Sequence, residues 1–211
     1  MTAASTAFLA LFVVVAAANW WSRWSDDARL ERLTKPTALV ALIGVALALD
    51  PVDPTVRTWF VVALVFSLAG DVFLLGGDER FVLGLASFLL AHIAYTVGFI
   101  VADDWRWIGF AVGAVLVGVL ALTVGSRIVA GARRSSAALG PPVVAYLLVI
   151  SAMAAAAAAA GNGWAIVGAA LFVTSDSLLG WRQFVTPARW MAPAVMITYH
   201  LGQAGLVISL V

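Results

Sequence analysis

The chain has 211 residues, of which 64% are hydrophobic and 11% are charged, and its formal net charge is +1. Soluble domains are roughly 45–50% apolar and about 25% charged, so this composition, with a mean hydropathy of +1.05, indicates a polytopic membrane protein. The near-neutral charge argues against a nucleic-acid partner, which would need a basic face. The absence of cysteine excludes disulfides, a thiolate nucleophile and a cysteine-ligated metal.

Eight segments are expected to cross the membrane, since a span needs roughly 20 mostly apolar residues. In chain order they are approximately residues 3–22, 35–50, 58–77, 81–102, 105–126, 140–160, 163–181 and 189–210. The second segment is short, so we expect Lys35 to extend to the lipid–water interface and Pro36 to lie in the first helical turn, where a missing N–H costs least. The predicted fold is all-α, with a single transmembrane domain over residues 1–211.

The basic residues are concentrated in one set of alternate loops. This set carries ten of the 12 arginine and lysine residues, namely Arg23, Arg29, Arg32, Lys35, Arg80, Arg127, Arg133, Arg134, Arg182 and Arg189. Arg57 and Arg106 lie in the other set. The positive-inside rule places the first set in the cytoplasm. We therefore expect both termini on the outer side of the membrane, in a bacterial cell.

The two halves of the chain show a loose correspondence at a constant offset of 105 residues. The matched pairs are Arg29 with Arg134, Pro36 with Pro141, Trp59 with Trp164, and Asp71 with Asp176. Four expected spans in each half would give a parallel repeat, related by an axis along the membrane normal. Chance identity is the alternative explanation for so few matches.

Two aspartates lie inside apolar segments, Asp71 in SLAGDVFLL and Asp176 in LFVTSDSLLG. An ionisable residue within hydrocarbon costs at least about 2.5–3.5 kcal/mol, which makes it a candidate for function. On the expected topology both lie roughly 9–11 Å from the cytoplasmic boundary, at the helical rise per residue. If they face each other, burial and repulsion would leave one protonated, giving a general acid and a general base. A purely structural pairing with another polar residue is the alternative.

Other polar residues in the expected spans are candidates for substrate binding or support. They are Lys35, His92, Tyr95, Tyr199, His200 and Asn19. His92 and Tyr95 share one helical face with Gly84 and Phe88. Tyr199 shares a face with Gln203, whereas His200 points about 100° away from Tyr199, so the two cannot line one site equally. Weaker candidates are Ser67, Tyr146, Ser175 and Ser177. Each could instead be an ordinary hydrogen-bonded packing residue.

Motifs of other enzyme chemistries are missing from the sequence. It contains no GxSxG elbow, no glycine-rich phosphate loop and no HExxH. With two histidines and no cysteine there are few metal ligands. We expect no metal and no cofactor.

The motifs around the aspartates resemble those of the YhhN-like family of membrane proteins, the lysoplasmalogenases. The matching features are Lys35-Pro36, Gly70-Asp71, the segment from Phe81 through Gly84, Phe88 and His92 to Tyr95, Ser175-Asp176, and Tyr199-His200. The resemblance implies an eight-helix hydrolase that cleaves the vinyl ether bond of lysoplasmalogens to a fatty aldehyde and a glycerophospho-head group. It implies Asp71 and Asp176 as the catalytic groups and membrane lysolipids as the partners.

The chemistry implied by the resemblance suits two carboxyl groups, one to protonate the vinyl ether and one to stabilise the cation and activate water. A single-chain lipid would enter between helices, with its phosphate near Lys35 or the loop arginines. Another ether lipid or lysolipid is an alternative substrate. A small proton-coupled transporter using the same Asp and His residues is the main rival function, and a non-catalytic membrane partner is a third.

Overall fold

The computed structural model describes residues 1–102 and 104–211, and this part of the chain is helical without strands. The helices are α1 (Ala3–Trp24), α2 (Ala28–Ala48), α3 (Pro54–Leu74), α4 (Phe81–Val101), α5 (Trp107–Leu120), α6 (Ser126–Ser135), α7 (Gly140–Ala160), α8 (Gly163–Phe184) and α9 (Met191–Ile208). A π-helical segment, Ala121–Gly125, joins α5 to α6 without a break. Short 3-10 turns, Asp78–Arg80 and Ala137–Leu139, precede α4 and α7.

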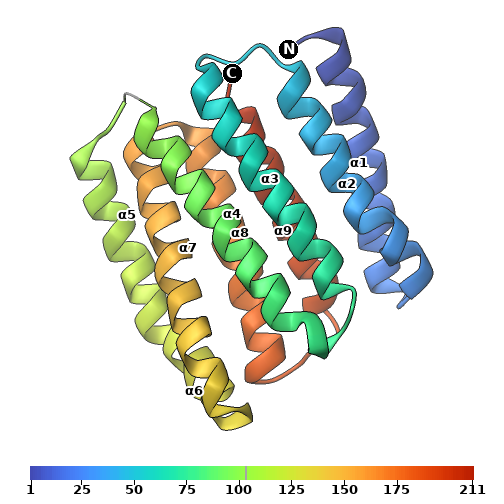
Figure 1. The fold of residues 1–211 in the computed structure, drawn as a ribbon, viewed down its shortest axis with the longest axis vertical. Coiled ribbons are helices and arrows are strands. Elements are labelled where there is room, and N and C mark those ends of the chain that lie inside the picture. Colours follow the sequence, from blue (N-terminus) through green and yellow to red (C-terminus); the bar gives the residue numbers. More distant parts are fainter. Residues whose placement is uncertain (103) are drawn as a thin grey trace.

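The helices lie side by side as an up-and-down bundle, and both termini are at the same end (Figure 1). Helices α1 to α4 contact one another in chain order, as do α6 to α9, and further contacts join α5 to α7, α4 to α7 and α1 to α9. The central helices α3, α4, α8 and α9 supply most of the large buried side chains, including Phe60, Tyr95 and Phe172.

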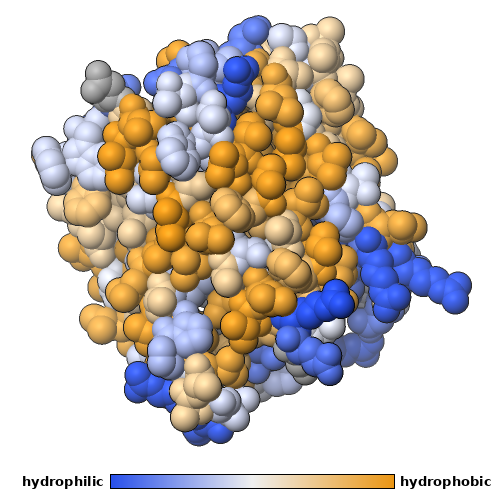
Figure 2. All heavy atoms as spheres, viewed as in Figure 1, coloured by the Kyte–Doolittle hydropathy of each residue, from blue (hydrophilic) through white to orange (hydrophobic). Residues whose placement is uncertain are grey.

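Seven segments of the described chain are long and apolar enough to cross a membrane: α1, α3, α4, Trp107–Ser135, Ala137–Ala160, α8 and α9. Their outward faces carry large exposed apolar residues such as Val14, Leu90 and Leu122. Apolar side chains cover most of the visible face, and hydrophilic ones gather at its two ends (Figure 2). The chain is therefore an integral membrane protein.

Helix α2 is as long as its neighbours but begins with charged residues. It runs from Ala28 to Ala48, and the Asp27 side chain caps its start by accepting from the backbone N–H groups of Arg29 and Leu30. Pro36 consequently lies well inside the helix, so our expectation that it occupies the first turn is wrong. The cap eight residues before Lys35 decides where the helix starts, and the proline is accommodated within it.

Glycines allow two helix pairs to approach closely near the aspartates. A Cβ at Gly70 of α3 would lie 2.6 Å from the Phe88 ring of α4. A Cβ at Gly168 of α8 would lie 2.7 Å from the backbone nitrogen of Leu206 in α9. Small residues bring membrane helices together in this way, since lipid gives no hydrophobic driving force between them. The α3–α4 and α8–α9 pairs are thereby fixed around the aspartates.

Candidate functional site: two aspartate clusters

Asp71 lies on α3 and is held by side chains from two other helices. The Tyr199 hydroxyl of α9 donates a hydrogen bond of 2.9 Å to Asp71 Oδ2. Lys35 Nζ of α2 lies 3.2 Å from Asp71 Oδ1. Asp71 is 1% exposed and Lys35 is 7% exposed, so the pair is buried. A buried carboxylate needs a countercharge and hydrogen bonds, and this cluster supplies both.

Lys35 does not extend to the membrane interface, and that expectation is wrong. Its ammonium group points inward to Asp71, at 3.2 Å. The physical reason is that Asp71 provides a fixed negative charge within reach, whereas a snorkelling lysine has only solvent as its partner. Lys35 is therefore part of the aspartate cluster.

Asp176 lies on α8 and forms a second cluster with α7 and α4. The Tyr146 hydroxyl of α7 donates a hydrogen bond to Asp176 Oδ2. His92 Nε2 of α4 lies 3.7 Å from the same oxygen. The Asp176 side chain is 13% exposed, so it is more accessible than Asp71. Among the described ion pairs, His92 is the basic partner of Asp176, and no lysine or arginine takes the place that Lys35 has beside Asp71.

The hydrogen bonds of His92 determine where its proton lies. Nδ1 is 2.5 Å from the backbone oxygen of Phe88, and a carbonyl oxygen only accepts. Nδ1 therefore carries the hydrogen, and in a neutral ring Nε2 is an acceptor. Nε2 has no hydrogen-bond partner among the described residues and faces an Asp176 oxygen. Two bare acceptors at this separation repel each other, so a proton on either group makes the pair favourable.

The two aspartates are held by different side chains. Among the hydrogen bonds of the described residues, each carboxyl group bonds to a different tyrosine. The Phe172 ring packs against both clusters, with its centroid 4.6 Å from that of His92 and 5.4 Å from that of Tyr199. The site is thus two neighbouring clusters, each with its own polar partners.

Tyr95 lies one helix away from the Asp71 cluster. Its hydroxyl donates a hydrogen bond of 2.5 Å to Gln203 Oε1, and Gln203 follows Tyr199 by one turn of α9. Phe60 packs edge-on against the Tyr95 ring, at 5.0 Å between centroids. The Tyr95–Gln203 hydrogen bond therefore joins α4 to α9, the helix from which Tyr199 bonds to Asp71.

His200 and Asn19 form their described hydrogen bonds with side chains outside both aspartate clusters, although the His200 ring centroid lies 5.5 Å from that of Tyr199. Trp20 Nε1 donates to His200 Nδ1 at 3.0 Å, and Phe12 packs edge-on against the His200 ring. Asn19 Nδ2 donates to Thr34 Oγ1 at 3.0 Å. These contacts join α1 to α9 and α1 to α2. Of the adjacent pair in α9, Tyr199 therefore reaches an aspartate and His200 does not.

Tyr146 was underestimated by the sequence reasoning, which gave it only a weak supporting role. It is the direct hydrogen-bond partner of Asp176. One signal was present in the sequence: the chain has three tyrosines, and all three donate hydrogen bonds to buried polar groups of this region. A buried tyrosine hydroxyl needs a polar partner, so tyrosines in apolar helices mark such sites.

Two openings reach the clusters. An apolar cleft contains Asp176 and Tyr146 in its wall, together with Leu85, Phe88 and Ile150. A polar cavity of about 320 Å³ contains Lys35, Arg23, Arg32 and Arg182. Leu74, Phe81 and Leu179 line both openings, so the two are neighbours. An amphiphile could place its chain in the first and its polar group in the second.

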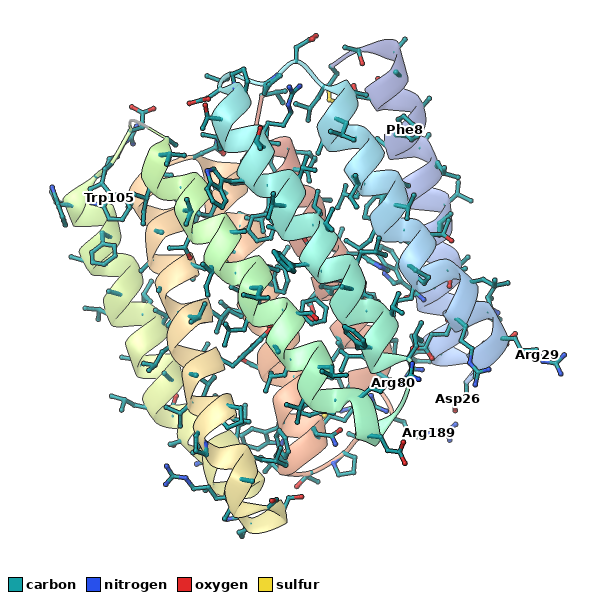
Figure 3. All side chains as sticks on the ribbon, in the orientation of Figure 1. Phe8, Asp26, Arg29, Arg80, Trp105 and Arg189 are labelled. Carbon is teal, nitrogen blue, oxygen red and sulfur yellow. The ribbon has the colours of Figure 1, made fainter. Side chains whose placement is uncertain are left out.

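The polar cavity belongs to the basic end of the bundle. Arg29, Arg80 and Arg189 lie at this end, whereas Trp105 lies toward the opposite end (Figure 3). Within the described residues, no group of three or more acids and histidines is placed to hold a metal ion. The donor set therefore consists of carboxyl, hydroxyl, imidazole and ammonium groups.

Comparison with known proteins gives one family. No curated protein and no solved structure gave a match. A model of the YhhN family matches residues 30–210, which include both aspartates and all the side chains that bond to them. The chain belongs to the YhhN family.

Proposed function

We propose that this protein is a membrane hydrolase that cleaves the vinyl ether bond of lysoplasmalogen-type lysolipids. The observation that carries the proposal is the Asp176 carboxyl group in the wall of an apolar cleft, with Tyr146 and His92 both at its Oδ2 atom. Family membership suggests a hydrolase. The cleft suits a fatty chain, and the neighbouring basic cavity suits a polar head group.

Asp176 is the proton donor in this proposal. It is more exposed than Asp71 and borders the cleft where a chain would lie. Tyr146 and His92 both contact Oδ2, which leaves Oδ1 to face a substrate. General acids in active sites must hold a proton near the operating pH, and a carboxyl group without a lysine or arginine partner is suited to that.

Asp71 is the fixed anion of the site. Lys35 and Tyr199 hold it ionised and in one orientation. Its negative charge favours a cation that forms nearby. Lys35 limits this effect because it offsets part of the charge. Asp71 acts through space and does not contact the reacting atoms.

The reaction proceeds in balanced steps. Asp176 gives its proton to the vinyl carbon remote from the ether oxygen, and the double-bond electrons form the new C–H bond. The resulting oxocarbenium ion takes up water, whose proton returns to the Asp176 carboxylate. The hemiacetal then transfers its hydroxyl proton to the ether oxygen, the C–O bond breaks, and an aldehyde and a free glycerol hydroxyl are released. No serine or cysteine nucleophile and no cofactor is needed.

The membrane arrangement in this proposal has eight spans. Helix α2 packs between α1 and α3 and matches their length, and its buried Lys35 is neutralised by Asp71, so α2 is proposed as the eighth span. The ten-to-two distribution of basic residues then puts the end with Arg29 and Arg189 in the cytoplasm. Both termini are external, and the cell membrane is a bacterial one.

A parallel 4+4 repeat is consistent with the packing. In the first half α1, α2, α3 and α4 contact one another in chain order, and in the second α5, α7, α8 and α9 do the same. Asp71 and Asp176 then lie on equivalent helices. Their hydrogen-bonding tyrosines, Tyr199 and Tyr146, do not correspond at the offset of 105 residues, so the two clusters have diverged in role.

Proton-coupled transport is the second candidate. It is favoured by the buried ion pair between α2 and α3, since paired charges inside a membrane also mark transport pathways. Uptake of a pH-sensitive dye into vesicles containing the purified protein would reveal it. If the protein is a hydrolase instead, the vesicles should show no proton flux and added lysolipid should be consumed.

The decisive experiment incubates the purified protein in detergent with three lysolipids that differ only at the first glycerol position: alkenyl ether, alkyl ether and ester. Aldehyde and free fatty acid are measured for each. Aldehyde from the alkenyl ether alone is the expected result, since only that bond is opened by carbon protonation. Equal turnover of the ester, or aldehyde release unaffected by Asp176→Asn, would contradict the proposal.

A further inference from the structure

The polar cavity between α1, α2, α8 and α9 is markedly basic. Its described lining contains Arg23, Arg32, Lys35 and Arg182, against one acid, Glu31. Glu31 forms an ion pair with Arg23, and Lys35 forms one with Asp71. Arg32 and Arg182 take part in none of the ion pairs of the described residues. Within the described part of the chain, these two arginines therefore have no carboxylate partner and are candidates to bind an external anion.

The cavity is large enough for an anionic group and its water. Its volume is about 320 Å³, far above the roughly 10–15 Å³ that one water molecule needs. Arg182 is half-buried and Arg32 is exposed, so the site has an inner and an outer arginine. Arginine binds phosphate with two parallel N–H donors, which favours phosphate over a single-point anion.

The position of Arg182 relative to Asp176 fits one kind of ligand. Both are on α8, six positions apart, which corresponds to a rise of about 9 Å along the helix axis. In a 1-alkenyl lysophospholipid about seven bonds join the vinyl carbon to the phosphorus atom, an extended span of about 8 Å at the advance of an extended backbone. The shared lining residues Leu74 and Leu179 connect the two places.

We infer that Arg182 and Arg32 form a phosphate subsite, which takes the phosphate of a single-chain amphiphile whose hydrocarbon chain lies in the apolar cleft. The identity of the amphiphile rests on the proposed function, whereas the binding of its phosphate does not. Lys35, to which the sequence gave this role as one option, is already neutralised by Asp71. The ligand enters from the basic side of the membrane.

The test measures binding without turnover. Purified wild-type protein is titrated with a 1-alkyl ether lysophospholipid and with the matching 1-alkyl glycerol, which lacks the phosphate, and dissociation constants are obtained from native mass spectrometry. We expect the phosphorylated lipid to bind roughly 10-fold tighter, as for one charge-assisted contact. Arg182→Gln should remove that difference, and Arg182→Lys should retain part of it. Glycerophosphocholine in competition distinguishes a free phosphate ester from a lipid.

Arg29→Gln is the matched control, since Arg29 is exposed at the same end of the bundle and points away from it (Figure 3). It should bind both lipids as the wild type does. Equal affinity of the two lipids for the wild type, or equal effects of Arg182→Gln and Arg29→Gln, would overturn the subsite. If Arg182→Gln does not fold, the affinities of Arg182→Lys for the two lipids still test the subsite. A binding difference without any aldehyde release would keep the subsite and reject the hydrolase.

Discussion

Asp71 and Asp176 are the same side chain in two membrane helices, but their neighbours give them different chemistry. Asp71 has a lysine and a tyrosine as partners and is 1% exposed. Asp176 has a tyrosine and a histidine and borders a cleft. A charged partner favours the ionised form of a carboxyl group. In the proposed mechanism, these different neighbours make Asp71 the fixed anion and Asp176 the acid.

Asp176→Asn should reduce turnover of an alkenyl lysolipid by at least roughly 10²-fold, the low end for general acid catalysis. The amide cannot donate an acidic proton, yet it keeps the shape and can still accept from Tyr146. Aldehyde release by the purified variant is the measurement, with thermal unfolding in detergent to show that it is folded. Asp50→Asn, at an exposed aspartate outside the helices, is the control and should behave as wild type. Near-normal turnover of a folded Asp176→Asn would remove Asp176 from the mechanism.

Lys35→Met should be strongly destabilising, since it leaves the buried Asp71 carboxylate without its countercharge. Breaking a buried pair from one side costs about 3–5 kcal/mol. The double variant Lys35→Met/Asp71→Asn should recover most of the loss, because both charges are gone. Denaturant unfolding in detergent measures all the variants.

The Arg23–Glu31 pair, whose side chains are 18% and 16% exposed, provides the comparison for this cycle. Arg23→Met should cost less than Lys35→Met, because this pair is closer to the solvent-exposed pairs that contribute about 0–1 kcal/mol. If Lys35→Met and Arg23→Met prove equally mild, the Lys35–Asp71 pair is not a buried ion pair.

At the scale of the helices, close approach through glycine sets the positions of the clusters. Gly168 allows the backbones of α8 and α9 to touch, and these helices carry Asp176 and Tyr199. Ser175 Oγ also donates to the Val195 backbone oxygen at 3.0 Å across the same interface. The two aspartate clusters thus share one rigid helix pair.

Gly168→Ala should destabilise the protein by about 1–3 kcal/mol, the usual cost of overpacking. The added methyl would lie 2.7 Å from a backbone atom, which cannot rotate away as a side chain could. Gly118→Ala, where nothing lies within 4 Å of the added carbon, is the control and should be neutral or slightly stabilising. The measurement is the melting temperature of each variant in the same detergent. Equal values for both variants would show that α8 and α9 are not in backbone contact.

At the scale of the whole molecule, the uneven basic charge predicts the orientation. Ten of the 12 basic residues belong to one side of the proposed topology. Reporter fusions after residues 30 and 135 should be active in the cytoplasm, and a fusion at the C-terminus should be active outside. A cytoplasmic C-terminus would mean that one proposed span, most simply α2, does not cross the membrane.

The sequence by itself determined the class of the protein and the helical segments, and it marked Asp71 as a candidate for function. Hydropathy is carried by each segment whatever it packs against, so apolar helices and the polar residues within them can be found one segment at a time. The same reasoning predicted the shared face of His92 and Tyr95, and both are buried. Where it was wrong, at Pro36 and Lys35, a partner outside the segment decided: the Asp27 cap and the Asp71 carboxylate.

The tertiary structure alone decided which polar residues meet. Tyr199 is 128 positions from Asp71, and Tyr146 is 30 positions from Asp176, so neither contact has a local pattern. It also decided that His200 bonds to Trp20 while its neighbour Tyr199 reaches Asp71. These outcomes depend on which helices are neighbours and on how each is rotated about its axis, and glycine contacts between helices fix both.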